Sequence, residues 1–168
     1  MAFIALVAVG SIGVGDNMRV TVTQVGPLFA RTLWVTAAYF VLYYFSLFRQ
    51  SLCAQFLTKK LKASSKDGKV TIRDVKYGPM SYQNDVMYAM NRVVGNQVEQ
   101  MTPFLFSLWA CAIVVSDGVA AQLGAIYLIF RVAYLAVYNT RFLLLSTVPC
   151  YMAIGVMWVH ILRAAPLQ

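Results

Sequence analysis

Charged residues are scarce in this 168-residue sequence, where lysine, arginine, aspartate and glutamate make up 12% against 60% apolar residues. An ordinary soluble domain carries about 25% charged residues, so this composition excludes that class and indicates an integral membrane protein. Histidine occurs once, as His160, near the end of an apolar run. A lone histidine in that setting is more often a packed or interfacial side chain than a haem or chlorophyll ligand.

Cysteine is also rare, and Cys53, Cys111 and Cys150 lack the close spacing of metal ligands. Their odd number gives no disulfide framework, so we predict no metal site. Residues 1–15 are apolar but have no basic segment before them, which argues against a secretory signal. At about 15 residues the run is also short for a membrane span. We therefore treat residues 1–26 as an apolar N-terminal extension.

Acidic residues number only six against fourteen basic ones, which gives a net charge of +8. Half of the basic residues fall in one segment: Lys59, Lys60, Lys62, Lys66, Lys69, Arg73 and Lys76. A basic segment beside apolar runs follows the positive-inside rule and argues against nucleic-acid binding. We expect this segment to face the cytosol and both termini to lie on the non-cytosolic side.

The apolar runs predict an all-α integral membrane four-helix bundle over residues 27–168. Its spans are expected at about 28–48, 86–115, 119–138 and 142–162. Between the first two spans lies a predicted basic loop, 58–82. Ser116-Asp117-Gly118 and the connection 139–141 are short, so the helices that they join should run antiparallel. Pro149 predicts a kink in the last span.

Two polar faces interrupt these apolar helices. The first consists of Arg92, Asn96 and Glu99, and the second of Arg131, Tyr134 and Tyr138. Spacings of i, i+4, i+7 and i, i+3, i+7 place each set on one side of its helix. An ionised side chain at membrane depth costs roughly 2.5–3.5 kcal/mol on insertion scales, so it is usually paired and usually functional.

Both faces can be placed by their distance from the turn at Ser116. At about 1.5 Å per residue, Glu99 lies roughly 24 Å and Tyr134 about 23 Å from it. The faces should share one layer, in which Arg131 is long enough to reach Glu99. Pro103 removes the N–H that would bond the Glu99 carbonyl, which leaves an acceptor free. Such a layer is either an ion pair that fixes helix register or a site for a zwitterionic or polyanionic ligand.

Three motifs in this order resemble those of the MAPEG family, the membrane-associated proteins in eicosanoid and glutathione metabolism. They are Arg92-x-x-x-Asn96-x-x-Glu99-x-x-x-Pro103-Phe104-Leu105, then Arg131-Val132-Ala133-Tyr134-x-x-x-Tyr138, then Pro149-Cys150. The last is similar to the branch that contains the microsomal prostaglandin E synthases and microsomal glutathione transferases. The resemblance covers about residues 28–162.

The resemblance implies a homotrimer in the endoplasmic reticulum or another organellar membrane, with glutathione between neighbouring subunits near the cytosolic face. Family activities on lipophilic substrates include glutathione transfer, peroxide reduction and eicosanoid isomerisation. By motif, the glutathione contacts are Arg49, Arg92, Asn96, Glu99, Tyr134 and Tyr138. Arg131 and Arg141 are the expected catalytic residues, because a nearby cation stabilises a thiolate.

Two departures leave the activity open. Val93-Val94-Gly95 differs from the pattern usual in glutathione-transferring members, and the connection that holds Arg141 is short. A non-catalytic, lipid-binding or structural subunit of a larger membrane complex is therefore the alternative. A small transporter or channel is a third reading, although one polar layer offers no continuous path across the membrane.

Overall fold

The computed structural model describes residues 28–64, 69–138 and 140–165, which contain four long helices and two short ones. The long helices are α3 (Ala30–Ser64), α6 (Asp85–Val114), α7 (Asp117–Val137) and α8 (Leu143–Ala164). The short helices, α4 (Ile72–Tyr77) and α5 (Met80–Gln83), connect α3 to α6. The described chain is all-helical, as predicted. The N-terminal extension, 1–26, lies outside the described residues.

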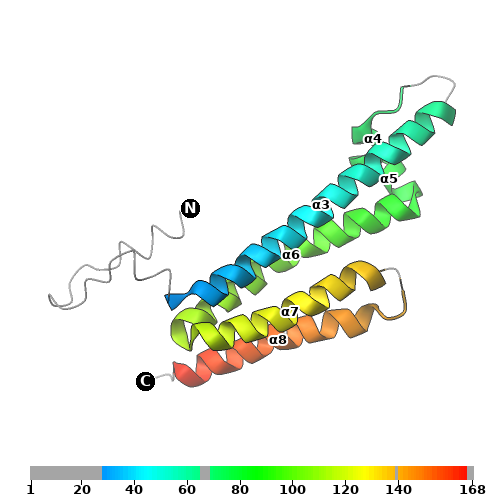
Figure 1. The fold of residues 1–168 in the computed structure, drawn as a ribbon. Helices are drawn as coiled ribbons and strands as arrows, with labels where there is room; N and C mark the ends of the chain where they lie inside the picture. The colour runs from blue at the N-terminus through cyan, green and yellow to red at the C-terminus, as the bar shows by residue number, and fades with distance from the viewer. Residues whose placement is uncertain (1–27, 65–68, 139, 166–168) are drawn as a thin grey trace.

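α7 and α8 form an antiparallel hairpin (Figure 1). Both helices pack against the second half of α6, and α7 also packs along the first half of α3. Among the described helices, these two are long and apolar enough to cross a membrane by length and composition. α3 and α6 have 35 and 30 residues. At 1.5 Å per residue they reach about 52 and 45 Å, which exceeds the roughly 30 Å of a bilayer core.

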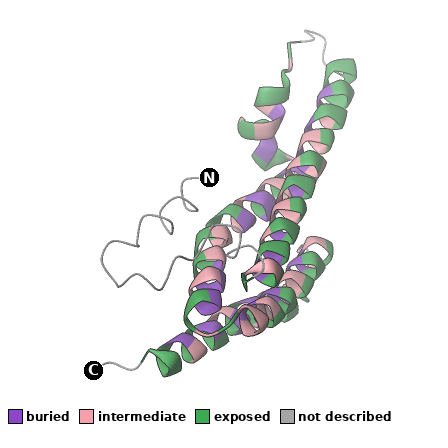
Figure 2. Ribbon diagram, turned by 60° about the vertical axis from the view of Figure 1, so that its left-hand side comes forward, coloured by how far each residue is buried: buried purple, intermediate pink, exposed green. Residues whose placement is uncertain are grey.

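Buried residues lie along the inner faces of the helices (Figure 2). Three buried aromatic rings pack together in the centre of the bundle. Phe104 of α6 stacks on Tyr127 of α7 with ring centroids 3.8 Å apart and planes at 8°. Tyr39 of α3 lies 5.2 Å from the Phe104 ring. All three side chains are buried. The aromatic centre therefore joins α3, α6 and α7.

Two features hold α7 close to α3. A Cβ atom built on Gly124 would lie 2.7 Å from Val35 Cγ1 and 2.8 Å from Leu108 Cδ1, so a larger residue would push these side chains aside. At the start of α7, the Asp117 carboxylate accepts hydrogen bonds from the backbone N–H groups of Arg31 at 3.2 Å and Thr32 at 2.8 Å. It thereby caps the first turn of α3, whose N–H groups have no partner within their own helix.

The segment predicted as a loop, 58–82, is largely helical. α3 continues to Ser64, because its last turns contain lysine, leucine and alanine, which favour a helix. α4 begins with a capping box in which the Thr71 side chain accepts from the Asp74 N–H and the Asp74 carboxylate accepts from the Thr71 N–H. The spacing Thr71-x-x-Asp74 was a signal for this helix that the loop prediction missed.

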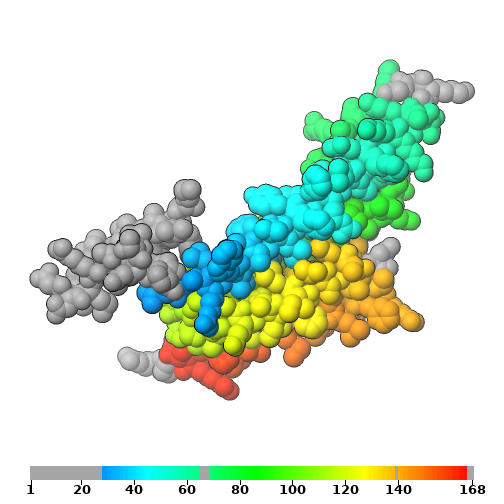
Figure 3. All heavy atoms as spheres, viewed as in Figure 1, coloured from blue at the N-terminus to red at the C-terminus, as the bar shows by residue number. Residues whose placement is uncertain are grey.

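Residues 51–64 and 69–90 form an arm that extends beyond the ends of α7 and α8 (Figure 3). Its own small core contains Ala54, Val75 and Met87. Asn91 secures its base, because its side chain accepts from Gln50 Nε2 at 2.8 Å and donates to the Lys76 carbonyl at 2.8 Å.

Candidate functional site

Arg131 is the largest fully buried side chain of the described residues, with 1% of its surface exposed. Its Nη2 donates to the Asn96 carbonyl at 2.9 Å. The guanidinium carbon lies 5.0 Å from the ring centroid of Tyr134 and 5.7 Å from that of Tyr127. A buried cation needs hydrogen-bond acceptors or other electron-rich groups around it, and the faces of aromatic rings are one such group. Arg131 therefore links α7 to the backbone of α6.

The turn of α6 before Pro103 receives donors from two neighbouring helices. Proline at this position removes the N–H that the Glu99 carbonyl would otherwise accept. Arg131 of α7 donates to the Asn96 carbonyl, and the Tyr39 hydroxyl of α3 donates to the Gln97 carbonyl at 2.6 Å. The donors thus reach the preceding carbonyls, and none of the described side chains bonds the Glu99 carbonyl itself.

The outer side of this layer carries the unburied charges. Arg92 and Glu99 are exposed on α6, and Asn96 between them is half-buried. Arg92 lies beside the hydroxyl of Tyr138, whose ring packs edge-on against Tyr134 with centroids 5.5 Å apart. The two polar faces therefore do meet in one layer. The charged side chains of the first face, Arg92 and Glu99, are exposed, whereas Arg131 of the second face is buried.

The ion pair expected between Glu99 and Arg131 does not form, although both residues lie in the described part of the chain. Burial explains the difference, because Arg131 is enclosed by α6 and the tyrosine rings whereas Glu99 faces outward. Glu99 lies roughly 24 Å from the Ser116 turn along α6, which is less than the roughly 30 Å thickness of a bilayer core.

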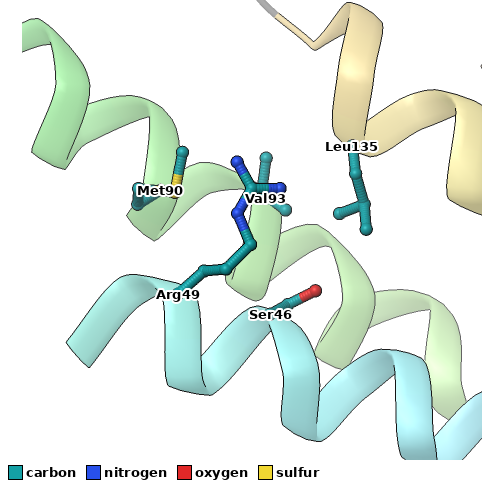
Figure 4. A pocket seen from close by; sticks show the side chains of 5 residues that line it. All are labelled: Ser46, Arg49, Met90, Val93 and Leu135. Atoms are coloured by element: carbon teal, nitrogen blue, oxygen red, sulfur yellow. The ribbon is translucent and has the colours of Figure 1, made fainter. Parts of the chain in front are cut away.

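Arg49 occupies a separate position. It points into a hollow between α3, α6 and α7 that Ser46, Met90, Val93 and Leu135 also line (Figure 4). The hollow measures about 10 Å³, which is room for a single water molecule and far less than a tripeptide needs.

A second hollow of about 400 Å³ lies on the outer side of α3 and is lined by Ala30, Leu33, Trp34 and Ala37. It offers no charged group, so neither hollow fits glutathione within one subunit.

Arg141 lies between α7 and α8 and is exposed, with its guanidinium carbon 5.1 Å from the Phe142 ring centroid. It is at the same end of α7 as Tyr138. Of the two arginines predicted to be catalytic, Arg141 is thus accessible at the surface, whereas Arg131 is enclosed.

Sequence reasoning missed two residues of the layer, Gln97 and Tyr127. The Gln97 amide is buried and finds no hydrogen-bond partner among the described residues. The Tyr127 hydroxyl is likewise buried and has no partner among them. Tyr39, which donates to the Gln97 carbonyl, was not among the predicted site residues either. Its place on the stripe Thr32, Val35, Tyr39, Ser46 and Gln50, which is buried in α3, could have identified it as an inward residue.

The comparisons with known proteins add one match. A sequence model of the MAPEG family matches residues 31–165, which is most of the chain. The chain belongs to the MAPEG family. No curated protein and no solved structure matches the chain. The MAPEG match covers every candidate site residue from Arg49 to Arg141, and it identifies the helical bundle as a membrane fold.

MAPEG proteins include glutathione-dependent transferases and also non-catalytic members. Membership therefore narrows the function to these classes.

Proposed function

We propose that this chain is a glutathione-dependent transferase, peroxidase or isomerase that acts on lipophilic substrates within a membrane. One observation carries the proposal: Arg92 and Glu99 are exposed charges on one face of α6, beside Tyr138, in a MAPEG chain. Opposite charges on one face match a tripeptide that has an amino group and two carboxylates. The residues present therefore fit glutathione chemically.

The site is shared between subunits in this proposal. A single subunit leaves Arg92 and Glu99 uncovered, and its hollow beside Arg49 is too small for a tripeptide. Three copies with α6 toward the centre would cover both charges and place a neighbour's α7 against each layer. Native mass spectrometry of the detergent-purified protein should give the trimer mass, and a monomer or dimer would contradict the shared site.

Each residue has a distinct task. Glu99 binds the amino group of glutathione, and Arg92 binds a carboxylate, with Asn96, Tyr134 and Tyr138 as polar contacts and Arg49 as a further cation. Arg131 acts through α6 as a positioning residue, because it is enclosed. Glutathione supplies a thiol that reacts as the thiolate with apolar electrophiles or hydroperoxides. Arg141 is the exposed cation that would favour the thiolate.

Glutathione binding tests the proposal directly. Calorimetry on the purified trimer should give weaker binding for Glu99→Gln and Arg92→Gln, by about tenfold or more, since a charge-assisted bond is worth roughly 1.5–3 kcal/mol. Arg163→Gln is the matched control, because Arg163 is an exposed arginine at the other end of the bundle. If wild type and both site variants bind equally weakly, the enzymatic proposal is lost.

A non-catalytic member is the second candidate, and the enclosure of Arg131 favours it. One of the two arginines expected to stabilise a thiolate cannot reach the surface, and the remaining one, Arg141, lies in a short connection. This candidate predicts a stable hetero-complex from native membranes without thiol-dependent turnover. A free homotrimer that turns over a lipophilic electrophile with glutathione would exclude it. Assignment to the prostaglandin synthase and glutathione transferase branch rests on the motifs, including Pro149-Cys150, and is part of the first proposal.

Orientation belongs to the same proposal. The arm faces the cytosol and both termini lie on the opposite side of the endoplasmic reticulum or another organellar membrane, because basic residues near span ends stay on the cytosolic side. Ser64 is exposed at the end of α3. A Ser64→Cys variant in sealed, right-side-out organelles should react with an impermeant thiol reagent added from outside. Reaction only after the membrane is opened would reverse the assignment.

A further inference from the structure

The exposed face of the arm changes from apolar to basic along α3. Leu52, Phe56 and Lys59 follow one another at i, i+4 and i+7, so they lie on one stripe of the helix. Leu52 and Phe56 have 47% and 69% of their surfaces exposed. The next residues, Lys60 and Lys62, are exposed as well. The boundary between apolar and basic surface on α3 therefore lies between Phe56 and Lys59.

The short helix α4 of the arm also combines exposed apolar and basic side chains. Arg73 of α4 is exposed beside Ile72, and Lys76 places its ammonium nitrogen 5.2 Å from the ring centroid of Tyr77. Tyr77 is itself 69% exposed. Tyrosine rings of this kind are typical of the layer between lipid headgroups and acyl chains.

Charge on the described part of the arm is one-sided. Residues 51–64 and 69–85 together contain six basic side chains and two carboxylates, which gives this region a net charge of +4. One of the carboxylates, Asp74, already accepts hydrogen bonds from Thr71. The surface therefore matches an anionic partner.

We propose that the arm binds the anionic headgroups of phospholipids in the membrane that holds the bundle. We define the binding surface as Phe56, Lys59, Lys60, Lys62, Arg73 and Tyr77. It begins where the bundle ends (Figure 3), so it lies next to the headgroup layer when α7 and α8 cross the membrane. Basic residues there are attracted to anionic lipid within a Debye length.

The apolar members of the surface decide between a lipid and other anionic partners. A nucleic acid or an acidic protein segment could neutralise the lysines, but it would leave the exposed rings of Phe56 and Tyr77 in water. A bilayer satisfies both kinds of side chain, because the aromatic and aliphatic groups enter the acyl boundary while the lysines reach the headgroups. This surface uses other residues than the outward layer of Arg92 and Glu99, so it does not depend on glutathione binding.

Lipid retention by the full-length protein tests the proposal. The detergent-purified protein is incubated with equal amounts of dioleoylphosphatidylglycerol and dioleoylphosphatidylcholine, and native mass spectrometry measures which lipid remains bound. We expect several-fold enrichment of phosphatidylglycerol at low salt, and no enrichment at high salt, where the charges are screened. The triple variant Lys59→Gln, Lys60→Gln and Lys62→Gln should lose the enrichment. Equal enrichment in wild type and the triple variant would overturn the proposal.

Three controls separate charge, fold and partner. Arg163→Gln removes a basic residue outside the arm and should keep the enrichment. Replacing the same three lysines by arginine preserves the charge, so this variant should keep the enrichment of phosphatidylglycerol. That result would show that the helix tolerates substitution at these positions. Heparin serves as a lipid-free polyanion. If the wild type binds heparin but has no preference for phosphatidylglycerol, the surface recognises another anionic partner and the lipid proposal is wrong.

Discussion

The two ends of the α3–α6 pair are stabilised in different ways. At the bundle end, one hydrophobic cluster contains 12 buried residues from all four long helices. In the arm, the cluster contains three, Ala54, Val75 and Met87. Local stability follows the number of buried apolar contacts, so the arm should open without unfolding of the bundle.

Polar side chains are also used differently at the two ends. In the bundle, Arg131 and Tyr39 donate to carbonyls of α6 and so fix the backbone that presents Arg92 and Glu99. In the arm, Asn91 bonds Gln50 and the Lys76 carbonyl, where few apolar contacts are available. The bundle is thus the more densely packed region, and the arm is a weakly packed, basic extension of it.

The largest effect is expected from the aromatic centre of the bundle. Phe104→Ala removes a fully buried ring that stacks on Tyr127, and such a truncation typically costs about 3–5 kcal/mol. Denaturant unfolding in detergent, followed by circular dichroism, measures the loss. Phe106→Ala is the matched control, because Phe106 lies on the same helix with 57% of its surface exposed. Equal losses for both variants would mean that the aromatic centre does not stabilise the bundle.

A smaller effect should distinguish two glycines of the bundle. Gly124→Ala places a methyl group against Val35 and Leu108, and overpacking of this kind costs about 1–3 kcal/mol. Gly155 has no atom within 4 Å of the corresponding position. Gly155→Ala should therefore be neutral or stabilise α8 by about 0.5–1 kcal/mol. The same unfolding assay measures both, and a stable Gly124→Ala variant would show that α7 can move away from α3.

The fold of the bundle could be predicted from sequence because long apolar runs have few alternatives in a membrane. The helices α6, α7 and α8 begin and end within a few residues of the ranges predicted for the last three spans, and among the described helices α7 and α8 are the membrane-span candidates. The arm was harder, because lysine-rich sequence is compatible with both a solvated loop and a helix. Two local signals favour a helix there: the lysine, leucine and alanine residues in the last turns of α3, and the capping residues Thr71 and Asp74 at the start of α4.

For the site, spacing predicted which residues share a layer, but not which way each one faces. Arg131 and Arg92 carry the same charge and both belong to the predicted polar faces, yet one is enclosed and the other exposed. The difference arises from neighbours on other helices, since Tyr127 and Tyr134 surround Arg131. Periodicity within one helix contains no information about such neighbours, which is why an ion pair with Glu99 was expected.

The hydrogen bonds at the base of the arm provide a test confined to that region. Asn91→Ala removes the bonds to Gln50 and to the Lys76 carbonyl, each worth about 0.5–1.5 kcal/mol. Hydrogen–deuterium exchange should become faster by about tenfold in α4 and α5 and stay unchanged in α7 and α8. Asn84→Ala, which removes only the cap of α6, should affect the first turn of that helix and leave α4 protected. Faster exchange throughout the bundle would show that arm and bundle form one cooperative unit.

The smallest effect concerns the pH dependence of the arm. Hydrogen bonds from the Thr71 hydroxyl and backbone N–H to the carboxylate hold the pKa of Asp74 below its usual value. A carboxylate whose pKa is lower in the folded than in the unfolded state stabilises the fold above the unfolded pKa, and this contribution is lost as pH falls through the folded pKa. Exchange in α4, corrected for the intrinsic rate, should therefore be constant near neutral pH and become faster below about pH 4. Asp74→Asn should remove that acid step while the exchange of α7 keeps its pH profile. If the step persists in the variant, another carboxylate controls the opening of the arm.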